Sequence, residues 1–400
     1  MLVETGSKLF IGGRWIAPRS ERRAEIRNPA TAEVLGVIPL GGAGDVEAAV
    51  AAAAAAYPAW RRTPPGDRVQ FLFRFKDLLE RHFEELAALI TREHGKIVAE
   101  SRGELRRGIE NVETACGIPT LMQGYNLEDV ASGIDETMIR QPLGVVAAIT
   151  PFNFPAMIPL WFLPYAIACG NTMVLKPSEK TPLTVLRLAK LLEETGLPPG
   201  VLNVVTGARE AAEALLVHPQ VRAISFVGST PVARHVYATA SAHGKRVQCQ
   251  GGAKNYVVVM PDADLEMSSK IVGESAFGCS GQRCLAVSVA VAVGAAREAF
   301  RERMVEVARN LRVGDGLDES VQMGPVISHE SKSRIEALIG KGEAAGGRIL
   351  VDGRGTLAGF ERGSFVKPTV IEDVPPASGL QEVEIFGPVL TLERAASLDE

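Results

Sequence analysis

The amino-acid sequence predicts an α/β protein with two doubly wound, open-sheet domains. Between residues 144 and 227, continuous apolar runs of strand length alternate with helical patterns. Such runs are typical of strands buried on both faces of a parallel sheet, and the alternation is that of βαβ units. The same alternation starts again after residue 250. A chain of 400 residues, of which 46% are apolar, is long enough to form both cores.

Composition limits the partners and the location that we expect. The formal net charge of -4 is small and mixed in sign, so nothing favours nucleic-acid binding. The apolar stretch 156–169 is broken by Pro159 and Pro164 and cannot span a bilayer, and the segment 1–14 does not resemble a secretory signal. The five cysteines are too widely spread for a disulfide framework, and the six histidines show no metal-ligand spacing. We therefore expect a cytoplasmic protein without a metal, a membrane or a nucleic-acid partner.

The N-terminal part is predicted to be a meander of short strands followed by helices. The strands lie between residues 8 and 40 and stop at Pro39. Asp45 is expected to cap a helix that runs through the alanine-rich segment 48–56 and ends before Pro58. The next expected elements are helices at about 66–94 and 98–123 and a polar, irregular segment at 124–143.

Two βαβ arrays follow, with a boundary near residue 250. The first should supply strands at 144–149, 172–175, 201–205 and 223–227, with helices at 155–169, 182–195 and 208–217. The second should supply strands at 255–260, 287–293, 348–351 and 368–371, with helices at 264–277, 296–311 and 329–345. Ligands of open α/β sheets bind at the carboxyl ends of the parallel strands, so the residues after each strand are the first candidates for a site.

The stretch from Phe277 to Cys284 carries two cysteines, two glycines and an arginine directly before the second cysteine. A neighbouring cation favours the thiolate, which is the nucleophilic form of cysteine, and glycines let the backbone approach a reacting atom. A Gly-rich turn with buried thiols is an equally good reading, because cysteine is among the most buried residue types. On this stretch alone, catalysis and packing are about equally supported.

Polar residues follow three of the first four apolar runs. Asn153 could donate to an oxyanion, although an Asx turn between prolines explains it as well. Lys176 and Glu179 could hold a ribose diol from both sides, although a solvated loop with a helix cap is the better reading in isolation. The segment 228–230, Gly-Ser-Thr, opens a helix whose free N–H groups suit a pyrophosphate. The common G-x-G-x-x-G fingerprint is absent here, so that signal alone is weak.

Five motifs occur in order along the chain. They are Pro-Phe-Asn-Phe-Pro at 151–155, Lys-Pro-Ser-Glu at 176–179, Phe-Val-Gly-Ser-Thr at 226–230, Gly-Gln-Arg-Cys at 281–284 and Glu-Ile-Phe-Gly-Pro at 384–388. Together they resemble the NAD(P)-dependent aldehyde dehydrogenase superfamily from about residue 8 to the end of the chain. Within it, the segments 107–113 and 253–255 and the Arg283-Cys284 pair are similar to the CoA-acylating branch. That branch oxidises methylmalonate semialdehyde and also accepts malonate semialdehyde.

The resemblance implies catalytic roles for two residues. Cys284 matches the nucleophile that attacks the aldehyde, and Asn153 and the backbone N–H of Cys284 match the oxyanion donors. Hydride then leaves to the nicotinamide and a thioester remains on Cys284. Cys279 matches no catalytic position, so packing is its expected role.

The resemblance also implies NAD as cofactor. The matched cofactor-binding positions are Thr150, Phe152, Lys176, Glu179, Lys180, Ser229, Gly251, Glu384 and Phe386. Lys176 and Glu179 would hold the adenine ribose and Ser229 the pyrophosphate. Glu384 and Phe386 would contact the nicotinamide ribose and ring.

Two departures from the family pattern carry information. Hydrolytic members have a Glu-Leu-Gly-Gly-Lys motif whose glutamate activates water, and Gln250 stands at that glutamate position here. An amide cannot take a proton at neutral pH, so the thioester should wait for a thiol, and coenzyme A is the implied co-substrate. Ala233 replaces a glycine common in the helix-opening turn, which affects how the pyrophosphate would sit.

Two arginines are the candidates for binding a carboxylated substrate. Arg283 adjoins the nucleophile, and Arg107 lies on the helix that faces the substrate tunnel in this branch. Two guanidinium groups can clamp a carboxylate with bidentate geometry. For Arg107, an ion pair with Glu104 or Glu110 is the alternative.

The resemblance also predicts how the chain is organised. We expect an NAD-binding domain at 1–123 and 144–250, an oligomerisation hairpin at 124–143 and a catalytic domain at 251–400 that lacks its C-terminal part. Family members use that part to assemble, so a homo-oligomer, a tetramer built as a dimer of dimers, is expected if it is present. The expected activity is the NAD-dependent, CoA-acylating oxidation of a small-molecule semialdehyde. A hydrolytic aldehyde dehydrogenase and an inactive nucleotide-binding fragment are the alternatives.

Overall fold

The computed structural model describes residues 8–400, and these form two compact units. The first unit contains the chain up to Ile26 together with Gly36–Leu89 and Arg102–Gly251. The second unit contains Arg27–Leu35, Ile90–Ser101 and Gly252–Glu400. The two short segments of the second unit lie within the range that the sequence division gave to the cofactor domain, so the chain passes between the units several times.

A seven-stranded sheet forms the centre of the first unit, with the order β11-β10-β7-β8-β9-β1-β2. Its strands are β1 (Leu9–Ile11), β2 (Arg14–Ile16), β7 (Val145–Ile149), β8 (Thr172–Lys176), β9 (Leu202–Val204), β10 (Val221–Val227) and β11 (Arg246–Gln250). Strands β7 to β11 are parallel, and the N-terminal hairpin β1–β2 joins β9 antiparallel. The strand order reverses between β7 and β10, and such a switch point is where open α/β sheets bind ligands.

Helices cover both faces of this sheet. The helices of the first unit are α2 (Ala43–Trp60), α3 (Pro65–Arg81), α4 (Phe83–His94), α5 (Val98–Cys116), α6 (Ile118–Leu121), α7 (Met157–Ala168), α8 (Leu183–Glu194), α9 (Arg209–Val217) and α10 (Thr230–Ala242), with the ends of α4 and α5 reaching into the second unit. Val174 packs in one core with α2, α9 and α10. Its strand neighbours Met173 and Leu175 point to the other face and are equally buried there, next to α7.

Three helix boundaries differ from the sequence prediction. Helix α2 begins at Ala43, because Asp45 does not occupy the cap position itself but accepts a hydrogen bond from Gly42 N at 3.0 Å. It continues through Pro58 to Trp60, since a proline in the last turn removes only one hydrogen bond. The expected helix at 66–94 is interrupted at His82, which has a non-helical backbone.

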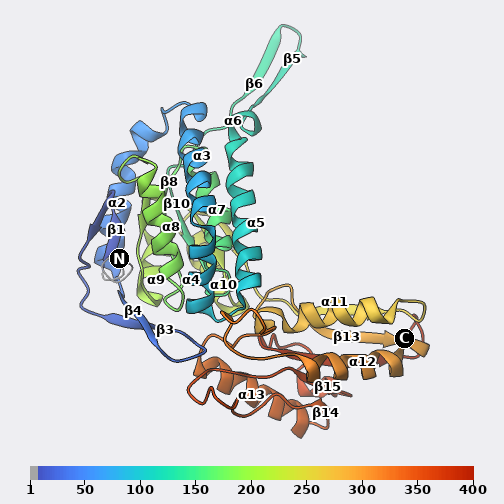
Figure 1. Cartoon of the computed structure of the whole chain (residues 1–400). Coiled ribbons are helices and arrows are strands. Elements are labelled where there is room, and N and C mark those ends of the chain that lie inside the picture. Colours follow the sequence, from blue (N-terminus) through green and yellow to red (C-terminus); the bar gives the residue numbers. More distant parts are fainter. Residues whose placement is uncertain (1–7) are drawn as a thin grey trace. The chain divides into compact units, whose positions relative to one another are not determined.

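The segment 124–143 forms a β-hairpin, as the resemblance implied, although its own polar pattern had indicated an irregular segment. Strands β5 (Tyr125–Ala131) and β6 (Ile134–Met138) pair antiparallel, and every residue of both is exposed. Figure 1 shows this hairpin projecting beyond the helices of the first unit. A further two-stranded sheet is made by β3 (Arg23–Arg27) and β4 (Val34–Pro39).

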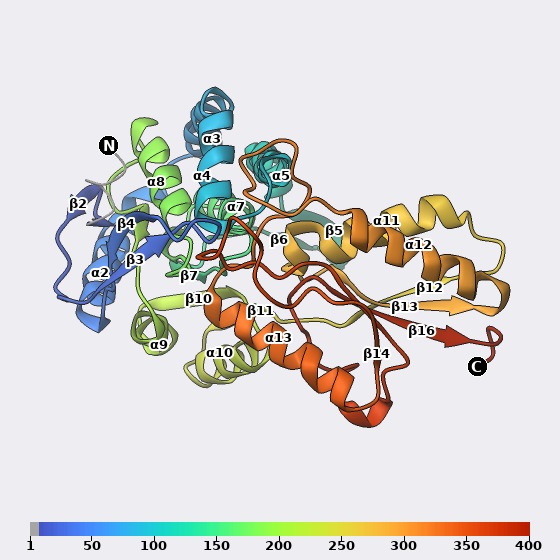
Figure 2. The same cartoon turned by 60° about the horizontal axis from the view of Figure 1, so that its bottom comes forward.

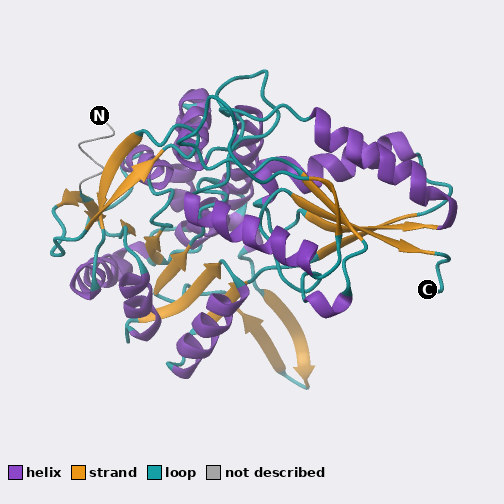
Figure 3. Ribbon diagram, turned by 90° about the horizontal axis from the view of Figure 1, so that it is seen from below, coloured by secondary structure: helices purple, strands orange, loops and turns teal. Residues whose placement is uncertain are grey.

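The second unit is a five-stranded sheet between helices, with the order β12-β13-β16-β15-β14. Its strands are β12 (Asn255–Val259), β13 (Val287–Val293), β14 (Arg348–Val351), β15 (Thr369–Glu372) and β16 (Val389–Ala395), and all but β14 are parallel. Helices α11 (Leu265–Phe277) and α12 (Arg297–Asn310) lie side by side on one face, and α13 (His329–Ala344) packs on the other (Figures 2 and 3). Successive residues Val389 and Leu390 contribute to opposite cores, as expected for a strand buried on both faces.

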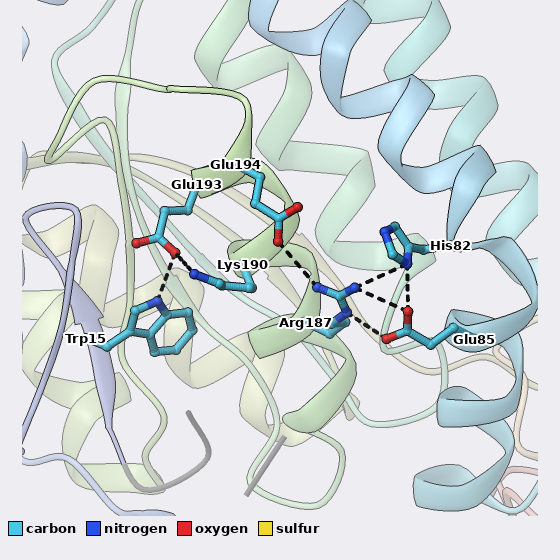
Figure 4. A network of polar contacts seen from close by, with 7 residues as sticks. All are labelled: Trp15, His82, Glu85, Arg187, Lys190, Glu193 and Glu194. Atoms are coloured by element: carbon cyan, nitrogen blue, oxygen red, sulfur yellow. Dashed lines mark hydrogen bonds and ion pairs between the residues drawn. The ribbon is translucent and has the colours of Figure 1, made fainter. Parts of the chain in front are cut away.

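An ion-pair network on α8 ties three elements of the first unit together (Figure 4). Arg187, whose side chain is 8% exposed, donates to both carboxylate oxygens of Glu85 on α4, at 2.7 and 3.2 Å. On the same helix Glu193 accepts from Lys190 at 2.7 Å and from the indole of Trp15 on β2 at 3.1 Å. The hydrogen bond from Arg187 holds the pKa of Glu85 below its ordinary value against the opposing effect of burial.

Two negative findings concern the residues that the structure describes. None of their helices is long and apolar enough to cross a membrane. Within the same residues, no cluster of three or more His, Cys, Asp or Glu side chains could bind a metal ion.

Candidate active site

The first group of candidate residues follows β7. Thr150 is 4% exposed, and its backbone N–H donates to the carbonyl of Lys176 at 3.1 Å, which extends the β7–β8 ladder by one residue. Asn153 is also 4% exposed. The structure thus places this amide in the interior at the carboxyl end of the central strand, at the switch point of the sheet.

Lys176 is the last residue of β8 and Glu179 lies three residues further on, with 3.7 Å between the ammonium nitrogen and the nearer carboxylate oxygen. Lys176 is 5% exposed, and its Nζ donates to the carbonyls of Pro177 and Gly207, both at 2.7 Å. Burial lowers the pKa of Lys176, and the charge of Glu179 opposes this shift. Glu179 is more accessible, with 42% of its side chain exposed, so it is the member of the pair with oxygens available to a ligand.

Phe152 and Lys180 form a second pair between the same two strand ends. The ammonium of Lys180 lies 5.6 Å from the centre of the Phe152 ring, which is cation–π distance. The carbonyl of Phe152 accepts from the hydroxyl of Thr181 at 3.1 Å. These contacts join the loops after β7 and β8, so their candidate residues share one edge of the sheet.

Ser229 is the N-cap residue of α10, directly after β10. Its backbone is extended, and its side chain makes no capping hydrogen bond. The first N–H groups of α10 are therefore not capped by this side chain, and a helix of this length attracts an anion there. Gly228 is required before it, because a Cβ at that position would lie 2.5 Å from the Phe226 ring.

Gly251 lies on the same side of the sheet, just after β11. A Cβ there would lie 3.2 Å from the hydroxyl of Thr230 and 3.6 Å from the methyl of Ala233. Ala233 is 7% exposed and packs inward, so its methyl group forms part of the first turn of α10. Because Gly251 lies so close to Thr230 and Ala233 in the first turn of α10, a residue without a side chain fits best directly after β11.

Arg107 lies on the exposed side of α5. Neither alternative ion pair is formed, since no salt bridge of Arg107 occurs among the residues described. Glu104 instead points to α7, where its Oε1 accepts from the backbone N–H groups of Ala156 and Met157 at 2.8 and 3.2 Å. Gly108 lets the two helices approach, because a Cβ would lie 2.7 Å from Leu160.

The loop that carries the two cysteines has an unusual backbone. Three residues in a row, Cys279, Ser280 and Gly281, have left-handed φ angles of 50°, 54° and 69°. Such a backbone is strained for residues with a side chain, so the surroundings must hold it in place. The hydroxyl of Ser280 donates to Gly324 O at 2.6 Å, and the backbone N–H of Cys279 donates to Glu100 Oε1 at 2.7 Å. Cys279 is 3% exposed, which agrees with a packing role.

Cys284 is partly buried and follows this loop in the second unit. Burial raises the pKa of its thiol, while its own backbone N–H acts in the opposite direction. The charge of Glu384 raises the pKa further, and the charge of Arg283 and the N–H of Leu285 lower it. Burial outweighs these donors, so the pKa of the thiol lies above its ordinary value in the protein as it stands.

Arg283 serves partly as a structural residue. Its Nη2 donates to the carbonyls of Ser275 and Glu274 at 3.2 and 3.4 Å, at the C-terminal end of α11. Its Nε is buried and has no hydrogen-bond partner within the described part of the chain. A buried donor without an acceptor is costly, so an acceptor supplied by a ligand would be favourable at this position.

Glu384 and Phe386 belong to a loop that packs against the cysteine loop. The contact is closest at Gly281, where a Cβ would overlap the carbonyl of Gly387. Phe386 has a left-handed φ of 54°, and the Glu384 carboxylate occupies the space that a Cβ on Gly252 would need. Burial raises the pKa of Glu384, and a hydrogen bond from Ala253 N opposes that shift.

Three residues of the second unit contact the site although no role was predicted for them from the sequence. Asn255 donates from Nδ2 to the carbonyls of Cys284 and Ala286, both at 2.9 Å. Lys254 donates to Val383 O at 3.0 Å, and burial lowers its pKa to about 8. Glu100 has one buried carboxylate oxygen without a hydrogen-bond partner in the described residues. A polar residue opening a strand, as Asn255 does, was the available signal, but its partners could not be deduced from the sequence.

The structure therefore groups the candidates in two sets. Thr150, Phe152, Asn153, Lys176, Glu179, Lys180, Ser229 and Gly251 lie at the strand ends of the first unit. Arg283, Cys284, Glu384 and Phe386 lie on two packed loops of the second unit. Arg107 lies on α5 of the first unit, and among residues 8–400 no hydrogen bond or ion pair joins its side chain to either set.

Sequence comparison and structure comparison with known proteins lead to the same family. A family model described as "Aldehyde dehydrogenase family" matches residues 15–400. Malonate-semialdehyde dehydrogenase 2 of Geobacillus thermodenitrificans is 51% identical over 393 residues, which cover 98% of this chain and 81% of that protein. The methylmalonate-semialdehyde dehydrogenase of Oceanimonas doudoroffii superposes with a TM-score of 0.95 at 48% identity, over 98% of this chain and 80% of that one. A structure from Sinorhizobium meliloti, assigned the same activity and complexed with NAD, gives a TM-score of 0.96 at 45% identity, over 98% and 80% of the two chains.

Proposed function

The chain belongs to the aldehyde dehydrogenase family, and from that premise we propose that it oxidises malonate semialdehyde or methylmalonate semialdehyde with NAD and transfers the acyl group to coenzyme A. Cleavage of the C–C bond to the carboxylate releases CO2 and leaves the electron pair on the α-carbon next to the thioester, and uptake of one proton from solvent completes the acetyl or propionyl group that reaches coenzyme A. The observation that carries the proposal is Cys284, a partly buried thiol that follows the strained residues 279–281 and lies next to Arg283, with the backbone N–H groups of Cys284 and Leu285 opposing the rise in its pKa that burial causes.

In the first step the Cys284 thiolate attacks the aldehyde carbon. The new C–S bond turns the carbonyl oxygen into an oxyanion, and the backbone N–H of Cys284 and the amide of Asn153 are the proposed donors to it. Collapse of this thiohemiacetal expels a hydride and leaves a thioester on Cys284. NAD, when bound, would supply the acceptor for this hydride.

The residues present in the first unit fit a dinucleotide. Ser229 and the N-terminus of α10 offer N–H groups that the Ser229 side chain does not cap, at the strand-order switch point. Gly251 leaves the first turn of α10 uncovered by a side chain, which suits a pyrophosphate there. The partly exposed carboxylate of Glu179 suits a ribose hydroxyl. Two of the three N–H donors of Lys176 already bind carbonyls. The main proposed role of Lys176 is therefore to hold the Glu179 carboxylate in place, and not to bind the ribose directly.

Gln250 supports transfer to a thiol. It ends β11 and is exposed, and its amide cannot act as the base that would activate water. The acyl group would instead pass to the thiolate of coenzyme A, which forms the new C–S bond while Cys284 leaves as thiolate. This step needs no base to deprotonate water.

The two arginines are proposed to bind the substrate's carboxylate. The buried Nε of Arg283 lacks an acceptor among residues 8–400, and Arg107 forms no ion pair there. A charge-assisted bond to a carboxylate would satisfy the Arg283 donor.

The direct test measures NADH formation with malonate semialdehyde and with methylmalonate semialdehyde, each with and without coenzyme A, while chromatography identifies the product. We expect acetyl-CoA and propionyl-CoA and only slow turnover without coenzyme A. Rapid release of free acid without coenzyme A would contradict the acylating reaction and favour hydrolysis. Absence of turnover with bound NAD would favour an inactive nucleotide-binding chain.

The proposal also covers the oligomeric state of the protein and its location in the cell. The hairpin β5–β6 exposes apolar side chains, among them Tyr125, Leu127 and Ile134 at 66%, 56% and 55%. A surface of this kind suits contact with another protein chain, and we propose that a homo-oligomer forms through it. Sedimentation of the purified protein would test this. A cytoplasmic location stays a prediction from the cysteine content.

A further inference from the structure

Asn255 holds the main chain at Cys284 by two hydrogen bonds. Its Nδ2 donates to the carbonyl oxygens of Cys284 and Ala286, each at 2.9 Å. Both acceptors can only accept, so the orientation of the amide is unambiguous. Asn255 opens β12, and its backbone pairs with Val287 of β13, so the donor is fixed to the sheet and not to a loop.

The Cys284 carbonyl lies inside a turn that contains the thiol, and the Ala286 carbonyl belongs to the last residue of that turn. Ala286 N donates to Arg283 O at 3.0 Å, which places Cys284 and Leu285 at the two central positions of a four-residue turn. Leu285 is 77% exposed and provides no packing that could hold this turn. Asn255 therefore supplies the side-chain contact that fixes both ends of the Cys284–Ala286 segment.

Fixing the Cys284 carbonyl also fixes the neighbouring N–H. No cis peptide bond occurs among the described residues, so the carbonyl of Cys284 and the N–H of Leu285 point in opposite directions across one planar peptide. With the oxygen held toward Asn255, the N–H is directed to the other side, where the Cys284 side chain lies. The N–H groups of Leu285 and Cys284 both lower the pKa of this thiol.

We propose that Asn255 is a positioning residue, which orients the peptide after Cys284 so that its N–H stabilises the thiolate. The inference rests on the proposed role of Cys284 as nucleophile. The charged groups that act on this thiol are Glu384, which disfavours the thiolate, and Arg283, which favours it. Asn255 is neutral, so its influence must come through geometry and not through charge.

The test measures the thiol directly. The rate of alkylation of Cys284 by iodoacetamide is followed against pH, with peptide mass spectrometry to separate it from Cys116, Cys169, Cys249 and Cys279. The variant Asn255→Leu keeps the size and neutrality of the side chain and removes the donor. Because one hydrogen bond to the thiolate is at stake, we expect the midpoint of the pH profile to rise by roughly 0.5–1 unit.

A matched control separates positioning from general damage. Gln381 also donates its amide to a main-chain carbonyl of the second unit, Val374 O at 3.0 Å, and Gln381→Leu should leave the midpoint unchanged. If Asn255→Leu does not fold, Asn255→Ser, which keeps a shorter donor, must still raise the midpoint. An unchanged midpoint in a folded Asn255 variant, or an equal shift in the control, overturns the proposal. The alkylation rate does not depend on turnover, so failure of the proposed function would not be mistaken for failure of this inference.

Discussion

At the scale of single residues, the contacts around Cys284 act on its main chain more than on its sulfur. Asn255 donates a hydrogen bond to the Cys284 carbonyl. Before it, the left-handed residues Cys279 and Ser280 donate hydrogen bonds to Glu100 and to the carbonyl of Gly324. The thiol itself is only partly buried. This arrangement keeps the nucleophile accessible while its backbone donors stay in place.

Replacing Cys284 by alanine should abolish acylation and leave NAD binding intact. Loss of a covalent nucleophile removes the reaction path, so the rate should fall by orders of magnitude. NADH formation and NAD titration of the purified variant check this. Cys279→Ala is the control and should keep most activity, and substantial turnover in the Cys284 variant would refute the assignment.

Arg283→Leu and Arg107→Leu should each raise KM for a carboxylated semialdehyde far more than for propanal. A charge-assisted bond contributes about 1.5–3 kcal/mol, so a loss of roughly tenfold or more is expected for the acid. Arg283 also holds carbonyls at the end of α11, and damage from that loss should slow both aldehydes alike. Equal effects on the two substrates in both variants would show that no carboxylate clamp exists.

NAD should be preferred over NADP. The partly exposed carboxylate of Glu179 can accept from a free ribose hydroxyl but would repel a 2′-phosphate. Lys176 offers little compensation, because its ammonium already donates to two carbonyls. Comparing kcat/KM for the two cofactors tests this, and a preference for NADP would disprove it.

At the scale of elements, the network on α8 makes stability depend on pH. The pKa of Glu85 lies below its ordinary value of 4.5 in the folded state, chiefly through Arg187. A depressed carboxyl pKa contributes stability that is present above pH 4.5 and is lost as the pH falls through the folded-state pKa. Glu85→Gln should thus lower the free energy of unfolding by about 1 kcal/mol at neutral pH, and the difference from the parent should shrink toward pH 3.

Urea unfolding at a series of pH values measures this difference. Glu84→Gln is the matched control, because Glu84 lies on the same helix as Glu85 but pairs with Arg102 of α5, whose side chain is far more exposed than that of Arg187. Its effect should stay within about 0.5 kcal/mol at every pH. If the Glu85 variant loses the same stability at pH 3 as at pH 7, the network does not act through the charge of Glu85.

Elements with a clear period or an apolar run could be predicted, and those shaped by distant contacts could not. Helices such as α11 and strands such as β13 agree with the prediction to within a residue. Strand β11 was missed because it alternates polar and apolar residues at the edge of its sheet. Strand β16 was missed because its run ends in Glu393 and Arg394. The hairpin at 125–138 exposes both of its faces, so burial left no pattern to read in its sequence.

The candidate site shows the same limit. Motif residues such as Ser229 could be assigned to a helix start from the sequence alone, since the strand and the cap are local features. The hydrogen bond from Asn255 to Cys284 joins residues that are 29 positions apart in the sequence. The hydrogen bond between Cys279 and Glu100 joins residues that are 179 positions apart. Such long-range hydrogen bonds depend on the packing of the folded chain, so no local sequence pattern predicts them.

At the scale of the whole molecule, cofactor binding should protect particular segments from hydrogen exchange. Addition of NAD should slow exchange most at the first turn of α10 and after β7 and β8, where the candidate residues of the first unit gather. Helix α12 carries none of these residues and serves as the internal control. Protection spread evenly over both regions would contradict the proposed cofactor site.

The interleaving of the two units has a consequence for synthesis on the ribosome. The segments 27–35 and 90–101 emerge early, yet their partners in the second unit come last: Ser364 N donates to Pro29 O at 2.8 Å, and Gly316 O accepts from Val98 N at 2.9 Å. At about 5–20 residues per second, the nascent Pro29 segment must wait on the order of tens of seconds for its partner. During that time its polar backbone and the adjoining buried strand positions have nothing to pack against. The second unit therefore reaches its full set of contacts only after its last segments have emerged, and completion of its folding is expected to be late.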